Sequence, residues 1–148
     1  MTKIVLGSDH AGFALKEIIR EHLEQGKYSM ADFGTFCENS IDYPDIALPL
    51  AKAVRAGEFD FGILVCGTGV GMAIAANKQR GIRAALCGDT FTARCAREHN
   101  DANVLTLGAR VTGPGLALEI VEAFLRSSFQ GGRHSRRLDK IAFMEQGR

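Results

Sequence analysis

The sequence has almost no excess charge of either sign. Its 148 residues hold 18 Lys and Arg against 17 Asp and Glu, which gives a formal net charge of +1. A chain without a strong overall field is not built to attract nucleic acid or an anionic membrane over its whole surface. Any basic site must therefore be local, and we expect neither a nucleic-acid partner nor a membrane partner.

The sequence also lacks a long apolar run. The longest nearly uncharged stretch, residues 61–77, is interrupted by glycines and is too polar to span a bilayer as one helix. Residues 1–6 pass directly into Gly-Ser-Asp-His, without the longer apolar region and small-residue cleavage site of a secretion signal. These absences predict a cytoplasmic protein.

Its four cysteines show neither a CxxC motif nor the spacing of a zinc site. In a reducing compartment we expect free thiols and no bound metal. Cys37, Cys87 and Cys95 are predicted to be packing residues. Cys66 is different, because it ends a predicted strand.

Short apolar segments alternate with amphipathic segments of helical length along the whole chain. Strands are predicted at 3–6, 28–33, 61–65, 82–87 and 103–107, and helices at 11–24, 43–56, 71–78, 90–99, 115–126 and 133–145. This alternation indicates one α/β domain over residues 1–148, with a five-stranded parallel sheet and helices on both faces. The extra C-terminal helix can either cap the sheet edge or reach over a neighbouring chain.

Ligands of open parallel sheets bind outside the carboxyl ends of the strands, which directs attention to the loops that follow them. One such loop, Gly67-Thr68-Gly69-Val70-Gly71, comes after a predicted buried strand and opens a helix. Its N–H groups and the positive helix end would converge on an anion or oxyanion. A tight turn that needs small residues explains the loop equally well. The spacing matches neither the dinucleotide fingerprint nor the P-loop.

Cys66 stands directly before that loop. A helix N-terminus favours thiolate, so Cys66 can act as a base or nucleophile. Alternatively it is a small buried hydrophobe, as most free cysteines are. The Thr68 hydroxyl can donate to a substrate oxygen, or it only caps the helix at Val70 or Gly71.

Polar side chains also follow other strands or begin and end helices near them. Asp9 and His10 follow the first strand, where they can bind sugar hydroxyls or an anion, or cap the next helix. Tyr43 can offer its phenol to the same edge or only pack there. His99 can exchange protons near neutral pH and Asn100 can donate from its amide, or the two form a helix end and a turn.

A basic segment follows Gly131-Gly132 near the end of the chain. Arg133 and Arg137 are four residues apart on a predicted helix, so their guanidinium groups share a face and can clamp a phosphate. Arg110, after the last strand, can join them. A solvated basic helix face is the alternative. Aromatic residues are not interleaved with these arginines, which disfavours nucleic-acid binding.

Taken in order, these motifs resemble the ribose-5-phosphate isomerase B family and the related galactose-6-phosphate isomerases. The matching segments are 7–13 (GSDHAGF), 42–44 (DYP), 66–71 (CGTGVG), 75–78 (AANK), 81–84 (GIRA), 99–105 (HNDANVL), 108–111 (GARV) and 131–134 (GGRH). They cover nearly the whole chain, and the ordered set is far more specific than any one motif.

The resemblance implies a Rossmann-like α/β/α fold, a metal-independent aldose–ketose isomerase without a cofactor, and a dimer or dimer of dimers with active sites at the subunit interface. Cys66 would be the base that moves a proton between C1 and C2 through a cis-enediolate, and His99 would open the furanose ring. The enediolate oxygen would be stabilised by Gly67, Thr68, Gly69, Val70 and Gly71. The sugar would be held by Asp9, His10, Tyr43 and Asn100, and its phosphate by Arg110, Arg133 and Arg137.

Some relatives use a carboxylate as the base, but Cys66 together with Val70 favours the thiol version. The predicted reaction is the interconversion of D-ribose 5-phosphate and D-ribulose 5-phosphate, in the non-oxidative pentose phosphate route. Two alternatives stay open. One is an isomerase of a six-carbon sugar phosphate such as allose or galactose 6-phosphate, and the other is a non-catalytic module that binds phosphosugars.

Overall fold

The structure, a computed structural model, describes residues 1–147. The strands are β1 (Thr2–Ser8), β2 (Tyr28–Asp32), β3 (Phe61–Cys66), β4 (Ala84–Leu86) and β5 (Val104–Gly108). The helices are α1 (Phe13–Glu24), α2 (Tyr43–Arg55), α3 (Val70–Asn77), α4 (Thr90–Glu98), α5 (Pro114–Arg126) and α6 (Arg133–Gln146). Every predicted element is present in the predicted order, so the expectation of an alternating α/β fold is confirmed.

Two elements are shorter than predicted by more than one residue, because side chains bind the backbone beside them. Before α1, the Asp9 carboxylate accepts a hydrogen bond from the Gly12 amide at 3.0 Å, which holds a turn and delays the helix to Phe13. Before β4, the side-chain carbonyl of Asn103 accepts from the Arg83 amide at 2.8 Å. That contact takes the place of a sheet hydrogen bond, and β4 begins only at Ala84.

The five strands form one parallel sheet in the order β2-β1-β3-β5-β4. The chain leaves β1 toward one edge of the sheet and returns to place β3 on the other side of β1. The gap between the carboxyl ends of β1 and β3 is therefore the topological switch point, where open α/β sheets bind their ligands.

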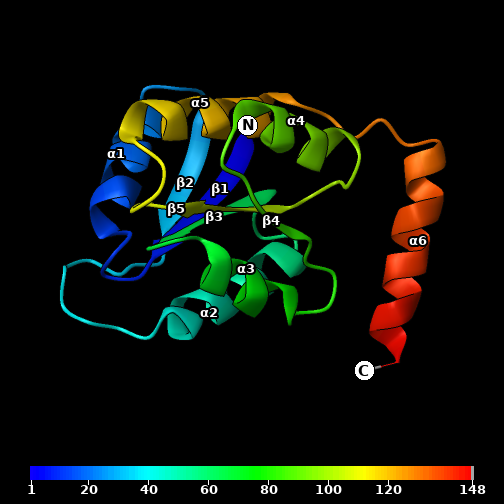
Figure 1. Cartoon of the computed structure of the whole chain (residues 1–148), viewed down its shortest axis with the longest axis horizontal. Coiled ribbons are helices and arrows are strands. Elements are labelled where there is room, and N and C mark those ends of the chain that lie inside the picture. Colours follow the sequence, from blue (N-terminus) through cyan, green and yellow to red (C-terminus); the bar gives the residue numbers. More distant parts are fainter. Residues whose placement is uncertain (148) are drawn as a thin grey trace.

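Helices cover both faces of this sheet (Figure 1). Because side chains alternate along a strand, Ile4 and Leu6 pack in the core beneath α1, α4 and α5, whereas Val5 packs in the core beneath α2 and α3. The three-layer α/β/α arrangement is thus confirmed. Within residues 1–147, no helix combines the length and the apolar character needed to cross a membrane.

Helix α6 stands apart from the two helical layers that cover the sheet, on the side of the molecule opposite the loop of residues 33–42 (Figure 1). Its C-terminal end approaches the body where the Glu145 carboxylate accepts a hydrogen bond from the Gly81 amide at 3.2 Å. Its other end is held by His134, the buried residue of the helix. Most of the α6 surface is exposed.

A buried cation links α1 to β2. Lys16 is fully buried, and its ammonium nitrogen lies 2.8 and 2.7 Å from the two carboxylate oxygens of Asp32. Asp32 also accepts a hydrogen bond from the Gly34 amide at 2.8 Å. The Gly34 carbonyl in turn accepts from the Ser8 amide at 2.7 Å, so this ion pair helps to fix the loop of residues 33–42 against the end of β1.

We predict that Lys16→Met lowers the free energy of unfolding by about 3 kcal/mol, because it leaves the Asp32 carboxylate without its buried partner. The effect stays at the low end of the usual range since the Asp32 side chain is 18% exposed. The double variant Lys16→Met/Asp32→Asn should recover part of the loss. Urea denaturation measures both, and a Lys16→Met variant as stable as the unaltered protein would contradict this account.

Candidate active site

The thiol of Cys66 lies at the switch point between β1 and β3. Cys66 ends β3, and its side chain is almost fully buried. Immediately after β1, the Asp9 amide donates a hydrogen bond to the Val65 carbonyl at 3.2 Å. Parallel pairing of the two strands thereby brings a carboxylate and a thiol to the same edge of the sheet, as the sequence predicts.

The loop after Cys66 is held by the residues at the end of β5. Three hydrogen bonds join them: Ala109 N to Cys66 O at 2.9 Å, Arg110 N to Gly67 O at 3.0 Å, and Thr106 Oγ1 to Gly69 O at 2.9 Å. In a trans peptide the N–H points opposite to the C=O. The amides of Gly67, Thr68 and Val70 therefore point away from β5, and these residues line a cavity.

This loop also places a hydrogen-bond donor against the sulfur. Gly69 has φ +81°, which brings its amide nitrogen to 3.1 Å from Cys66 Sγ. Gly69 is also the N-cap of α3, so the positive end of the helix dipole lies beside the same donor. Thr68 Oγ1 accepts a hydrogen bond from the Val70 amide at 3.3 Å, although the N-cap of α3 is Gly69, and the hydroxyl proton of Thr68 stays available to donate.

A cavity of about 400 Å³ opens over the thiol. It is lined by Asp9, Tyr43, Cys66, Gly67, Thr68, Val70, Gly71, Ile74 and Arg110. All but one of these are predicted site residues. The sequence analysis missed Ile74, although its place one turn after Val70 on α3 was a usable signal.

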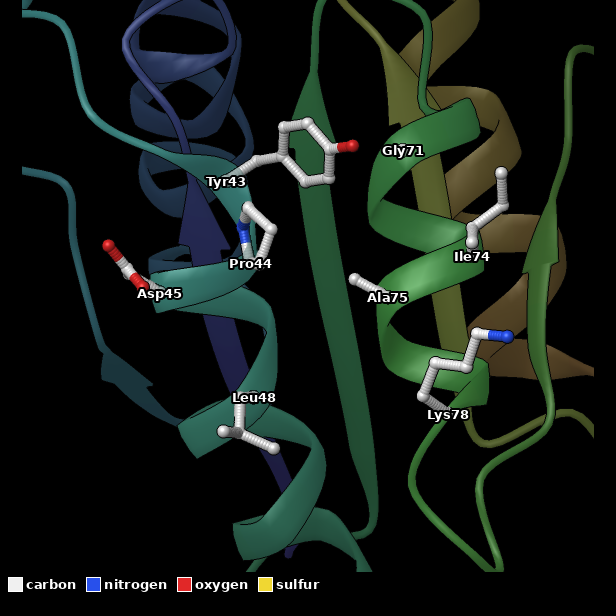
Figure 2. Close-up of a pocket in the computed structure, with 8 residues that line it drawn as sticks. All are labelled: Tyr43, Pro44, Asp45, Leu48, Gly71, Ile74, Ala75 and Lys78. Atoms are coloured by element: carbon white, nitrogen blue, oxygen red, sulfur yellow. The ribbon is translucent and has the colours of Figure 1, made fainter. Parts of the chain in front are cut away.

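An apolar groove of about 430 Å³ adjoins this cavity, between α2 and α3 (Figure 2). Figure 2 shows the Tyr43 ring extending from the start of α2 toward Gly71, and both residues line the cavity and the groove. A Cβ on Gly71 would come within 2.7 Å of the ring, so only glycine leaves room for it. Cys66, Gly67 and Thr68 do not line the groove. The candidate active site is therefore the cavity, which these residues do line.

His10 is not among the residues that line the cavity. Its Nδ1 accepts a hydrogen bond from the Ile41 amide at 3.2 Å. In a neutral imidazole this contact places the remaining proton on Nε2. His10 thus fastens the far end of the loop of residues 33–42 next to Asp9.

Besides His10 and Gly69, four more predicted site residues do not line this cavity. The His99 ring stacks on His134, and Asn100 lines a separate cavity of about 310 Å³ beside α6. Arg133 and Arg137 lie on α6, on the opposite side of the molecule from the loop of residues 33–42 (Figure 1). Arg110 lines the thiol cavity whereas Arg133 and Arg137 lie on α6, so the expectation that the three arginines act together stays a prediction that involves a second copy of the chain.

The other three cysteines differ in their surroundings, and all four are free. Cys87 is buried, as predicted. Burial is the main cause that raises its pKa to about 11; the negative charge of Asp89 adds to the rise, and a hydrogen bond with Thr92 opposes it. Cys95 is half-buried. Cys37 is exposed in the loop of residues 33–42, so its prediction as a packing residue was wrong.

In the part of the chain that the structure describes, no three His, Cys, Asp or Glu side chains gather in a group that could hold a metal ion.

Together, the fold and the cavity describe an α/β protein of the isomerase class, with a buried thiol at the switch point of the sheet beside a glycine-rich loop that begins a helix. Comparison with known proteins agrees, because the family model described as Ribose/Galactose Isomerase matches residues 4–141. The chain belongs to this family.

Individual relatives are similar over their whole length. The ribose-5-phosphate isomerase B of Escherichia coli (strain K12) is 49% identical, with 100% of this chain and 99% of the relative covered. The structure of the Clostridium thermocellum ribose-5-phosphate isomerase B superposes with a TM-score of 0.97 at 53% identity, covering 99% of both chains. The Mycoplasma genitalium enzyme of the same name, solved with bound ribulose-5-phosphate, gives a TM-score of 0.94 at 44% identity, covering 99% of this chain and 98% of that chain.

We predict that Gly108→Ala disturbs the loop over the thiol. The new Cβ would stand 2.6 Å from the carbonyl carbon and oxygen of Thr68, a backbone contact that cannot give way without moving the loop. The expected cost is about 1–3 kcal/mol of unfolding free energy, together with loss of isomerase activity. Gly88→Ala is the matched control, because nothing lies within 4 Å of its Cβ. Equal stability and activity in the two variants would refute the close approach.

Proposed function

We propose that the protein interconverts D-ribose 5-phosphate and D-ribulose 5-phosphate. One observation carries the proposal: a buried thiol that ends a central strand lies 3.1 Å from a loop amide at the start of a helix. The similarity to enzymes named ribose-5-phosphate isomerase B supports it, as does the ribulose-5-phosphate bound in one of their structures.

The reaction requires removal of a weakly acidic proton next to a carbonyl. In the open-chain aldose, Cys66 as thiolate takes the proton from C2. The C–H electron pair forms the C1=C2 double bond, and the carbonyl pair moves onto O1, which gives a cis-enediolate. The proton on O2 then passes to O1, the electron pair left on O2 forms the C2=O2 carbonyl, and the C1=C2 pair takes the proton back from the Cys66 thiol at C1, which completes the ketose and restores the thiolate. The amides of Gly67 and Thr68 and the Thr68 hydroxyl stabilise the oxyanion more than they stabilise the substrate.

The remaining site residues bind and orient the substrate in this proposal. Its hydroxyl groups are held by Asp9, His10, Tyr43 and Asn100. Its phosphate is held by Arg110, Arg133 and Arg137, whose planar guanidinium groups suit forked hydrogen bonds to phosphate oxygens. The phosphate does not react, so its binding energy serves to position the sugar. His99 donates and accepts the proton that opens the furanose ring.

A complete site of this kind needs two copies of the chain. Arg133 and Arg137 do not line the thiol cavity, and the helix that carries them, α6, stands apart from the other helices (Figure 1), so we infer that a neighbour supplies these two arginines. Exposed apolar side chains occur at both places: Leu48 and Ile74 in the groove of Figure 2, and Ile141 and Met144 on α6. We therefore propose a homodimer, or a dimer of dimers, with active sites at the interface.

A second substrate class has support, because the description of the matching family, Ribose/Galactose Isomerase, names two kinds of sugar. A six-carbon sugar phosphate such as allose or galactose 6-phosphate is therefore the second candidate. A non-catalytic phosphosugar-binding module would not need a thiol held against an oxyanion loop.

The free cysteines support a location in the cytoplasm, where thiols stay reduced.

We predict that Cys66→Ala lowers kcat for ketopentose formation from D-ribose 5-phosphate by about 100-fold or more, since a positioned general base contributes at least that much. The assay is run in EDTA, with allose and galactose 6-phosphates in parallel. Cys95→Ala serves as the control thiol and should keep its activity. A Cys66→Ala variant with a nearly unchanged kcat would rule out the thiol as the base.

We also predict that Arg137→Ala raises KM for D-ribose 5-phosphate by about tenfold, because one charge-assisted contact to the phosphate is lost. Arg136→Ala is the matched control, since Arg136 is exposed on the same helix and has no role in the proposed site. Steady-state kinetics measure both variants. If KM is the same for the two, Arg137 does not bind the phosphate.

A further inference from the structure

His134, a residue with no role in the proposed site so far, contacts His99, the proposed ring-opening histidine. The imidazoles of His99 and His134 are stacked, with ring centroids 4.4 Å apart and an angle of 12° between their planes. His134 is only 7% exposed, although it belongs to a helix whose other described residues are exposed or half-buried. The stack covers one face of the His99 ring and leaves its edge, with both nitrogens, to meet a substrate.

Backbone contacts bring the two rings together. The segment before α6 is attached to the end of α4, where the Gln130 amide donates a hydrogen bond to the Glu98 carbonyl at 3.0 Å. Gly131 and Gly132 then take positive φ values of 65° and 59°, which turn the chain into α6. His134 falls in the first turn of that helix, directly against His99, where α4 ends.

His134 is surrounded by positive or potentially positive groups. His99 faces it from the end of α4, and Arg133 and Arg137 face it from its own helix. Burial, followed by these three groups, lowers the pKa of His134 below its ordinary value. A stacking partner with a lowered pKa competes less with His99 for a proton.

We propose that His134 is a positioning residue for the acid–base step in which His99 opens the sugar ring. This inference rests on the proposed function. Rotation of the His99 ring would break the stack, so His134 restricts that ring to one plane and keeps its nitrogens oriented toward the substrate. The same contact ties His99 to the helix that carries Arg133 and Arg137, so that the proton donor and the phosphate clamp move as one unit.

The ring step can be separated from the thiol step by the chemistry of the two sugars. In D-ribose 5-phosphate, O4 closes a furanose ring onto C1. In D-ribulose 5-phosphate, the oxygen that would close a five-membered ring onto C2 carries the phosphate, so the ketose stays open. Exchange of its C1 proton with deuterium oxide therefore needs Cys66 and the oxyanion loop but no ring opening.

The test compares His134→Ala with His134→Phe, which keeps a flat ring but cannot be protonated. We expect His134→Ala to lower kcat for consumption of D-ribose 5-phosphate by about tenfold, because a mispositioned proton donor loses much of its effect. Exchange of deuterium into D-ribulose 5-phosphate should stay within about twofold of the unaltered protein. His134→Phe should regain most of the lost kcat, and His99→Ala should show the same split between the two assays as His134→Ala.

Three results would overturn the inference. The first is an equal loss in both assays, which would mean a purely structural role for His134. The second is an unchanged kcat in His134→Ala. The third is a His134→Phe variant as slow as His134→Ala, because stacking would then not explain the effect. By contrast, failure of the unaltered protein to turn over D-ribose 5-phosphate would overturn the proposed function itself, and this role with it.

Discussion

The site depends on the close approach of two backbones, the loop after Cys66 and the end of β5. The carbonyls of residues 66, 67 and 69 accept hydrogen bonds from residues 109, 110 and 106 respectively. Because each of these carbonyls points toward β5, the N–H of the same peptide unit points the other way, toward the cavity. Gly108 lets the loop come this near. The proposed oxyanion site is thus built by sheet geometry and needs no charged side chain of its own.

The same geometry limits what one chain can do alone. The carboxyl ends of β1 and β3 hold the thiol, a carboxylate and the glycine-rich loop, but α6, which carries Arg133 and Arg137, stands on the side opposite the loop of residues 33–42 (Figure 1). In the proposed two-fold dimer, a partner's α6 would reach the cavity while the partner's own cavity would receive the first protomer's helix. Catalysis and assembly are coupled in this account.

The sequence predicts the elements, their order and the residues around the thiol, because apolar periodicity marks strands and helices and parallel strands share one carboxyl edge. It does not predict where α6 goes, since the two glycines before it allow many directions. Buried Lys16 and the stack of His134 on His99 also escape prediction, because each depends on a partner far away in the sequence. Cys37 was misjudged for a similar reason: composition does not say which loop lies on the surface.

The most direct test of the central claim, a site shared between two copies, is complementation of two inactive variants. Cys66→Ala and His99→Ala are unfolded together, refolded as a mixture and assayed on D-ribose 5-phosphate. In a mixed dimer one site has both mutations and the other has none, so random pairing restores about a quarter of the unaltered rate. A mixture no more active than its two components would contradict the account, because thiol and histidine would then belong to the same chain's site.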